Sequence, residues 1–375
     1  MPVYLDHAAG GPLRPDAREA MIPWLTSRFG NPSGSHQVAR AAREAIDSAR
    51  DSVAELIGAE PGCVVFTSGG TESDNLAVLG TLAARPGCVV VSAVEHPAVI
   101  QAAAASGREV RVAPVGPDGV VEPAGLRPLL DGDVALVSVQ TVNHETGVIQ
   151  PVGDIARLVH RRAPRALFHT DAVQAAAWLD LPDVTAEADL VSVSSHKLGG
   201  PQGAGALGVR RGAVVSPLLH GGGQEREMRS GTQNVAAIVG FAAAAVAALK
   251  TRSETCARVT DLRNDLSTNI LRAIPSARET AAGAARVPGH VHVRFPGVES
   301  EALLVLLDER GVCASAGAAC ASGALDPSPV LLAMGVDKDE ALCSLRLTLG
   351  FTTTADDTET AAAAVIDSVR RLSGS

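Results

Sequence analysis

Lysine is the scarcest charged residue in this sequence. Only Lys197, Lys250 and Lys338 occur among 375 residues, and arginine supplies almost all the other positive charge. Lysine, unlike arginine, can lose its proton near neutral pH and act as an amine nucleophile or form a Schiff base. Lys197 stands behind a histidine and ahead of a glycine-rich turn, so it is the candidate for that chemistry.

Positive charge as a whole and aromatic side chains are also scarce. The formal net charge is −9 and aromatic residues make up 2% of the chain. Nucleic-acid-binding proteins need a basic surface for phosphates and aromatic rings for base stacking. The sequence therefore predicts no direct binding of nucleic acid.

Long apolar runs, a signal sequence and paired cysteines are missing as well. The stretch FAAAAVAALK at 241–250 is rich in alanine and ends in a charge, so we expect no membrane-spanning segment. The N-terminus, MPVYLDHAAGG, lacks the basic-then-apolar order of a signal peptide. The six cysteines form no CxxC pair and histidines do not cluster at ligand spacing. We predict a cytoplasmic protein with no membrane partner, no disulfide framework and no metal.

Helical and strand-like patterns alternate along the first two thirds of the chain. Apolar residues recur at helical spacing from Gln37 to Ile57, and Gly58 follows as a stop. Short β-branched runs come next, separated by helix-like stretches: CVVF at 63, CVVVSAV at 88, VALVSVQT at 134, ALFHT at 166 and LVSVS at 190. This alternation predicts an α/β fold with a mainly parallel sheet covered on both faces.

The pattern changes beyond about residue 240. A long helical stretch reaches Ile274, and a strand-like HVHVRF, a helix ESEALLVLLDER, the loop CASAGAACASGALDPSP and a last helix near 356–372 follow. We expect a large domain at 16–245 and a smaller C-terminal α+β domain at 246–375, with residues 1–15 as an arm that packs with the small domain.

Polar residues stand where several predicted strands end. SGGTESDN at 68–75 opens a helix, so it either holds a phosphate or is an ordinary capped turn. Asp171 in FHTDAVQ either pairs with a protonated pyridine nitrogen or caps a helix. Ser194, His196 and Lys197 follow the strand LVSVS. Open α/β sheets bind ligands at such strand ends, so these residues predict one crevice.

Two glycine-rich stretches need separate interpretations. GAGALG at 203–208 matches GxGxxG but precedes a strand instead of opening a helix, so we do not interpret it as a dinucleotide site. HGGGQEREMRSGTQN at 220–234 carries Arg229 and Thr232 before a long helix. It either contacts an anion or is a solvated loop.

Among the cysteines, Cys320 is the one placed to react. It lies among the small residues of 317–323, which leave the loop free and the thiol reachable. Cys63 and Cys88 stand in apolar strands, where a cysteine packs as an inert core residue.

A pyridoxal phosphate enzyme needs a lysine for the aldehyde, a carboxylate for the ring nitrogen, a phosphate site and a group beside the ring. This sequence offers Lys197, Asp171, a phosphate-holding helix N-terminus and His96 in VEHPAV. In this arrangement the chain resembles the NifS/IscS-type cysteine desulfurases, which are class-V members of the fold-type I pyridoxal phosphate enzymes. The resemblance runs nearly end to end, through YLDHAA, FGNPSGSH, FTSGGTESDN, VEHPAV, NHETGVIQP, HTDAVQ, SSHK, HGGGQE, RSGT, GAACASG and SLRLTLG.

The resemblance implies a role for each matching residue. Lys197 carries the cofactor, Asp171 holds its pyridinium nitrogen, Gln174 contacts its ring hydroxyl, and His96 stacks on the ring and moves protons. The other implied contacts are the phosphate ligands Gly70, Thr71, Ser194 and His196, with Thr232 from the second subunit of a homodimer, the substrate ligands Arg346 and Asn143, and His144 beside the cofactor.

The implied reaction converts L-cysteine into L-alanine. Lys197 takes the Cα proton, and the thiolate of Cys320 attacks the substrate sulfur to become a persulfide. The outer sulfur of the persulfide is then transferred to a protein acceptor. A free cysteine has a pKa of about 8.5, so Cys320 must lose its proton to its surroundings or through His96.

The chain departs from the family at two places near this site. The family's Ala-Thr-Thr-Pro is replaced by AGGP at 9–12, which removes two hydroxyls, and its Asn-Asn-Glu by NHE at 143–145, which puts His144 where an asparagine contacts the cofactor. The chain also stops soon after its last predicted helix, without the extension that housekeeping members use to dock an iron–sulfur scaffold. The identity of the sulfur acceptor is therefore left open.

Three other functions share these residues. A selenocysteine lyase has the same frame, a class-V aminotransferase makes Cys320 incidental, and a catalytically idle partner protein keeps the fold alone. Intact Lys197 and Asp171 argue against the idle protein. Joint assay of alanine and sulfide from cysteine separates the remaining ones.

Overall fold

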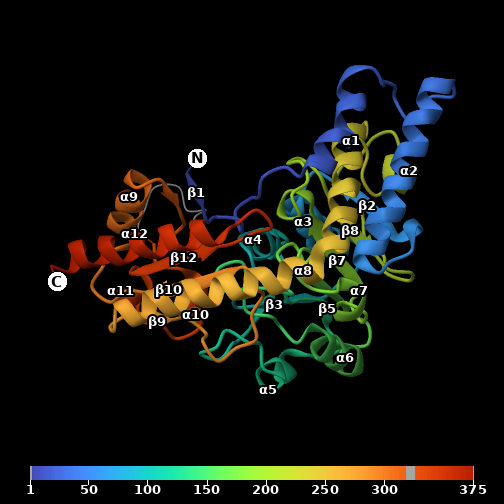
Figure 1. Cartoon of the computed structure of the whole chain (residues 1–375). Helices are drawn as coiled ribbons and strands as arrows, with labels where there is room; N and C mark the ends of the chain where they lie inside the picture. Colours follow the sequence, from blue (N-terminus) through green and yellow to red (C-terminus); the bar gives the residue numbers. More distant parts are fainter. Residues whose placement is uncertain (1, 318–325, 375) are drawn as a thin grey trace.

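A seven-stranded sheet forms the centre of the larger part of the protein (Figure 1). The structure, a computed structural model, describes residues 2–317 and 326–374. The strand order is β2-β8-β7-β6-β5-β3-β4, in which β4, β3, β5, β6 and β7 pair in parallel and β8 is antiparallel to both of its neighbours. The strands are β2 Val64–Thr67, β3 Cys88–Ser92, β4 Val110–Ala113, β5 Val134–Ser138, β6 Leu167–Asp171, β7 Leu190–Ser194 and β8 Gly205–Val209.

The helices of this part pack around the sheet because their apolar faces are buried in two core clusters beside it. They are α1 Pro15–Thr26, α2 Gln37–Ile57, α3 Gly70–Ala84, α4 Pro97–Ala105, α5 Pro123–Leu126, α6 Val152–Arg162 and α7 Leu181–Val184. Short 3₁₀ turns cover Pro61–Cys63, Arg127–Leu129, Ser195–Lys197 and Gln224–Glu227. The predicted α/β fold with a mainly parallel sheet is confirmed.

Helix α2 shows how closely local sequence sets an element. His36 caps its start, because Nδ1 of that side chain accepts a hydrogen bond from the backbone N–H of Ala39 at 3.3 Å. Gly58 ends it in the left-handed conformation at φ 65°, which favours glycine. The helix spans the residues that the apolar periodicity predicts.

The C-terminal part has its own antiparallel sheet and its own core. Strand β10 (His290–Arg294) lies between β9 (Arg278–Glu279) and β12 (Ser344–Thr348). The helices are α9 Ser300–Glu309, α10 Pro329–Ala333, α11 Lys338–Ala341 and α12 Ala355–Ser373. Leu303, Leu307, Leu345, Leu347 and Val365 are among the buried residues of this separate cluster. The strand-like HVHVRF and the two longest helices occur where the sequence predicts them.

Helix α8 (Val235–Ala273) links the two parts and runs 39 residues without a break, as Figure 1 shows. Its first half, up to Ala245, belongs to the core beside the large sheet, whereas Val259, Leu266 and Ile270 belong to the C-terminal core. We therefore propose that the division between the predicted domains, placed at 245/246 from the sequence, lies inside this helix.

Helix α8 also corrects one expectation from the sequence. By length and composition it is apolar enough to cross a membrane, although we expected no such segment. Half of its most apolar window is buried inside the protein, and the helix as a whole packs against α1, α2 and α12. A core helix of this kind passes the same test of apolarity.

The N-terminal arm joins the C-terminal part. Strand β1 (Val3–Tyr4) pairs in parallel with β11 (Val312–Cys313), and Leu5 is buried in the C-terminal core. The residues that follow, Ala8 to Pro12, lead back toward the end of β7, where the N–H of Gly11 bonds to the carbonyl of His196. The arm thus crosses the junction at which the predicted site residues lie.

Candidate active site

The carboxyl ends of the parallel strands carry the polar residues that the sequence picks out. Asp171 is the last residue of β6 and Ser194 the last of β7, while Lys197 ends the 3₁₀ turn that follows. His96 lies four residues beyond β3 and caps α4, because its Nδ1 accepts from the N–H of Ala98 at 3.1 Å. Parallel pairing brings these ends to one edge of the sheet.

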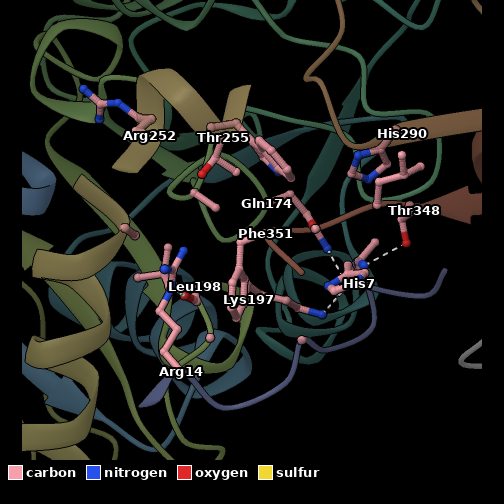
Figure 2. A pocket seen from close by; sticks show the side chains of 18 residues that line it. His7, Arg14, Gln174, Lys197, Leu198, Arg252, Thr255, His290, Thr348 and Phe351 are labelled. Atoms are coloured by element: carbon pink, nitrogen blue, oxygen red, sulfur yellow. Dashed lines mark hydrogen bonds between the residues drawn. The ribbon is translucent and has the colours of Figure 1, made fainter. Parts of the chain in front are cut away.

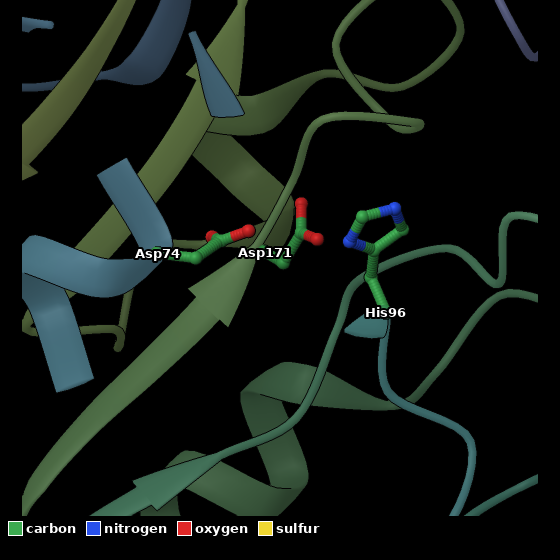
Figure 3. A group of neighbouring side chains, drawn as sticks. All are labelled: Asp74, His96 and Asp171. Carbon is green, nitrogen blue, oxygen red and sulfur yellow. The ribbon is translucent and has the colours of Figure 1, made fainter. Parts of the chain in front are cut away.

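Asp171 lies between a second carboxyl group and an imidazole. Figure 3 shows its carboxylate between Asp74, on α3, and the ring of His96. One ligand atom of each residue lies within 4.8 Å of the others, a spacing that a metal ion could also use. Burial raises the pKa of Asp171 and, with the charge of Asp171, raises the pKa of Asp74 well above its usual range. A positively charged group placed here would stabilise the charged form of these carboxyl groups; the absence of a metal stays a prediction.

Burial also lowers the pKa of His96, an effect that the nearby charge of Asp171 opposes. His96 is therefore neutral at pH 7, and its Nδ1 is occupied as an acceptor. The proton of the ring is consequently on Nε2.

Lys197 and Gln174 both reach the N-terminal arm, as Figure 2 shows. The amine of Lys197 donates to the carbonyls of Ala8 and, at 2.8 Å, of Ala9. The amide of Gln174 donates to the same Ala8 carbonyl at 2.8 Å. These contacts lie in a pocket shared with His7, Arg14, Trp178, His290, Thr348 and Phe351. The arm therefore forms one wall of the site.

The predicted phosphate ligands lie around the first turn of α3. Gly69, at φ 153°, precedes Gly70, and a Cβ on Gly70 would come within 2.7 Å of Val173 and 3.6 Å of Ser194. Ser194 Oγ is 2.9 Å from Nδ1 of His196, whose pKa burial lowers to about 4. The first amides of a helix have no intrahelical hydrogen-bond partner. Together with these side chains they are suited to bind an anion.

Thr71 and Thr232 are both exposed, and Thr232 lies in a groove of the same chain with Ser68 and Arg229. Arg229 binds Glu72 through Nε at 2.8 Å, which attaches the loop 220–234 to the start of α3. Thr232 thus lies in the same groove as Ser68, which comes just before the first turn of α3. Its predicted contribution to a second subunit remains a proposal.

The antiparallel sheet supplies Arg346 on β12, opposite His292 on β10. Nη2 of Arg346 binds Oδ1 of Asp6 at 2.8 Å, Nη1 donates to the carbonyl of His144 at 3.0 Å, and the buried Nε has no hydrogen-bond partner within the described residues. The guanidinium is almost fully buried. It is a fixed cation close to the strand-end residues.

Asn143 and His144 belong to a tight turn after β5. Asn143 uses its amide within the protein: its Oδ1 accepts from the N–H groups of Glu145 and Thr146, and its Nδ2 donates to the carbonyl of Val94 at 3.1 Å. The ring of His144 stands edge-on to that of His96, with centroids 5.1 Å apart. His144 therefore lies beside the proposed site, whereas the Asn143 side chain shapes the turn.

Cys320, the predicted nucleophile, lies outside the described residues. Of the described cysteines, Cys63 and Cys88 are buried in or beside strands, and Cys313 is partly buried in β11. Their positions agree with the structural roles expected for Cys63 and Cys88.

Several buried polar residues at this site are not evident in the sequence. Glu95 accepts from Ser92 Oγ at 2.5 Å and from the N–H of Gln140 at 2.7 Å, and burial raises its pKa to about 8. His290 and His292 face the site from β10, and burial lowers both pKa values to about 3. The only available signal was the alternation of HVHVRF, which puts both histidines on one face of a strand.

The family model for the aminotransferase class-V family matches residues 3–360. The chain is 39% identical over 376 residues to a cysteine desulfurase IscS from Methanosarcina thermophila, covering 99% of this chain and 92% of that protein. It is 42% identical over 381 residues to a cysteine desulfurase from Cereibacter sphaeroides, covering 99% and 97%.

The structure is also similar to a solved structure of a NifS-like protein. The TM-score is 0.90 at 33% sequence identity, with 98% of this chain and 99% of the other chain covered. Sequence and structure thus agree along almost the whole chain, and the resemblance drawn from the motifs is confirmed. This chain belongs to the aminotransferase class-V family and, within it, to the NifS/IscS-type cysteine desulfurases.

Proposed function

We propose that this protein is a pyridoxal phosphate-dependent cysteine desulfurase, which turns L-cysteine into L-alanine and passes the sulfur to Cys320 and then to an acceptor. The observation that carries the proposal is the meeting of three strand ends: buried Asp171, His96 beside it and Lys197 from the next strand. The family membership and the names of the relatives support the same activity.

The described residues fit pyridoxal phosphate. Asp171 and Asp74 form a buried acidic pair, and Oδ1 of Asp74 has no hydrogen-bond partner among the described residues, so a cationic pyridine nitrogen is a suitable neighbour. Gly70, Thr71, Ser194 and His196 would hold the phosphate, Gln174 the ring hydroxyl and Lys197 the aldehyde carbon. When bound, the cofactor supplies an electron sink for reactions at the Cα atom of an amino acid.

Two groups of the chain would move protons at the substrate. Lys197 takes the proton from Cα, since a lysine amine that has lost its proton is a base as well as a nucleophile. His96, which is neutral, can take the proton of a thiol on a ring nitrogen and, as an imidazolium, give a proton to Cβ as the sulfur departs. Arg346 orients the substrate by binding its carboxylate.

The sulfur transfer then balances without a further reagent. The thiolate of Cys320 forms an S–S bond to the substrate sulfur, while the bond between that sulfur and Cβ breaks and its electron pair accepts a proton. Cysteine plus an enzyme thiol therefore gives alanine plus an enzyme persulfide. A thiol acceptor afterwards takes the outer sulfur.

A homodimer is part of the proposal. Helices α1 and α2 and the loop between them expose the apolar side chains of Ile22, Leu25, Phe29 and Val38, and Phe29 and Val38 line a hollow there. An exposed apolar patch of this kind suits a subunit interface. Thr232 is exposed, as a contribution to a partner's site requires. A cytoplasmic location also remains a prediction, and the acceptor is a protein of undetermined identity.

Incubation of the purified protein with L-cysteine, pyridoxal phosphate and dithiothreitol tests the function. We expect alanine and sulfide in equal amounts, and selenide from selenocysteine would measure the preference between the two substrates. Cys320→Ser should bind cysteine but release no sulfide, whereas Cys313→Ser should keep most of the activity. Loss of the amino group to a keto acid without alanine would indicate an aminotransferase instead.

A further inference from the structure

Glu145 occupies an unusual position behind the turn that carries Asn143 and His144. Its side chain is 1% exposed, and one oxygen, Oε1, lies 3.7 Å from Nε2 of His144. The other oxygen, Oε2, faces the C-terminal part of the protein, where it meets two segments that are adjacent to the cysteine-bearing residues 318–325.

The first of these segments begins helix α10. Ser328 Oγ donates a hydrogen bond of 2.6 Å to Oε2 of Glu145 and accepts one of 3.2 Å from the N–H of Leu331. Ser328 is buried, and α10 packs through Val330 and Leu331 against Val94, just before His96. The chain is therefore fixed close to where it leaves residues 318–325.

The second segment ends at Gly317. A Cβ on Gly317 would overlap Oε2 of Glu145 and would lie 3.5 Å from Nε2 of His292, so the backbone passes directly against the carboxyl group. Two residues earlier, Ser315 and Arg346 exchange backbone hydrogen bonds of 3.2 and 2.7 Å. On the other side of residues 318–325 the chain is thus held by the strand of Arg346 and packs against the same oxygen.

Glu145 is consequently linked to the residue predicted to bind the substrate carboxylate, Arg346, as well as to the flanks of the Cys320 segment. Arg346 donates to the carbonyl of His144, the residue before Glu145, and its charge also acts on the Glu145 carboxyl. Burial raises the pKa of Glu145, an effect that the Ser328 hydrogen bond and Arg346 oppose. A buried carboxyl group with this set of neighbours is costly unless its contacts hold.

We propose that Glu145 is a positioning residue for sulfur transfer: it fixes the two flanks of the Cys320 segment, at Gly317 and Ser328, to the turn beside His96. This inference rests on the proposed desulfurase activity and adds a residue that contacts neither the substrate nor the cofactor. The positions of the two ends limit where the thiol of Cys320 can reach, so a residue that holds them affects the sulfur transfer.

The test compares Glu145→Ala, Glu145→Gln and Ser328→Ala with the exposed control Glu301→Gln. The rate at which iodoacetamide alkylates Cys320 is measured by peptide mass spectrometry, with and without pyridoxal phosphate, and Cys313 serves as the internal reference. We expect Glu145→Ala to raise the Cys320 rate about tenfold, because a hydrogen bond to a carboxyl group is lost, and Ser328→Ala to raise it less. Glu145→Gln should restore most of the parent rate, since its amide oxygen can accept from Ser328 Oγ.

Turnover provides the second readout. Sulfide release by Glu145→Ala should fall about tenfold to 100-fold, while the cysteine-dependent absorbance change of the bound cofactor keeps its concentration dependence. Unchanged Cys320 alkylation in both Glu145→Ala and Ser328→Ala would overturn the inference. If Glu145→Ala does not fold, Ser328→Ala and Glu145→Gln decide alone. A parent protein that makes no sulfide would reject the desulfurase function, and the alkylation rates would still test the anchor.

Discussion

The two halves of the active site are built in different ways and carry opposite electrostatic character. The strand-end half, His96, Asp171, Ser194 and Lys197, comes from successive strands of the large sheet. The antiparallel half, His290, His292 and Arg346, comes from strand pairing in the C-terminal sheet. Three buried carboxyl groups, those of Asp171 and of its neighbours Asp74 and Glu95, lie at the first half, whereas in the second half neutral histidines flank a guanidinium.

Burial shifts the pKa values of the two halves in opposite directions. It raises the pKa of Asp74, Glu95 and Asp171 on one side and lowers the pKa of His290 and His292 on the other. We expect a substrate amino acid to lie between the two halves. The carboxyl groups would then be near the proposed cofactor ring, and Arg346 would be near the carboxylate of the substrate. The substrate would therefore bind in one orientation, and four experiments test the comparison of the two halves.

Lys197→Ala should have the largest effect, since it removes the proposed nucleophile and base from the strand-end half. Desulfuration should fall at least about 10⁴-fold, and Lys197→Arg should not restore it, because a guanidinium stays protonated. The measurements are sulfide release and the mass of the borohydride-reduced cofactor adduct. The exposed Lys338→Ala should match the parent; normal turnover of Lys197→Ala would refute the proposed role of this half.

Arg346→Lys tests the antiparallel half. The planar fork of arginine binds Asp6 and the His144 carbonyl together, and a single ammonium cannot replace both contacts and a substrate carboxylate. The KM for cysteine should rise about tenfold to 100-fold with a smaller fall in kcat. Steady-state kinetics measure this split, and an unchanged KM would assign the substrate carboxylate to another residue.

Opposite pH dependences would distinguish the halves in the stability of the protein. Glu95 has its pKa raised from 4.5 to about 8, so the folded state binds more protons and stability is lost as the pH rises through this range. His290 has its pKa lowered from 6.5 to about 3, so the unfolded state binds more protons and stability is lost as the pH falls below 6.5.

Removing each group should therefore change the pH slope of stability in opposite senses. The melting temperature of Glu95→Gln minus that of the parent should increase as the pH rises from 5 to 8. The same difference for His290→Gln should increase as the pH falls from 7 to 5. Melting curves across pH 5 to 8 measure both. Parallel shifts of the two variants with pH would contradict the assignment of opposite character.

Gly10→Ala should have the smallest effect. A Cβ there meets nothing closer than His196 Cδ2 at 3.7 Å, an ordinary contact, so stability should change by no more than about 0.5 kcal/mol. Gly350→Ala is the matched opposite, because its Cβ would overlap the ring of His7. Denaturant unfolding of both variants tests whether there is room for a side chain at residue 10, where the family has a hydroxyl-bearing residue. A large loss of stability in Gly10→Ala would show that there is no such room.

The strand-end half was predictable because each residue follows a local signal. β-branched runs give the strands, and the polar residue after each run comes to the same sheet edge once the strands pair in parallel. Asp171, Ser194 and Lys197 therefore followed from pattern, and the family resemblance supplied their proposed roles. The fold class followed from the same alternation of strands and helices, and the family followed from the resemblance.

The antiparallel half depends on pairings that no local signal carries. His292 lies opposite Arg346 across 53 residues of intervening chain, and Glu145 meets Ser328 183 residues away in sequence. Asn143 illustrates the same limit, because its type suggested a ligand contact while the fold uses its amide inside a turn. The resemblance identified Arg346, but register alone brings the histidines beside it.

The continuous helix α8 has a further consequence for how this protein can vary. Each residue of an α-helix adds about 1.5 Å of rise and about 100° of rotation. One residue inserted between Leu249 and Val259, where the helix passes from one core to the other, would turn the C-terminal core out of phase with the large sheet. Arg346 would then be carried away from Asp171, so the middle of α8 tolerates changes of residue type far better than changes of length.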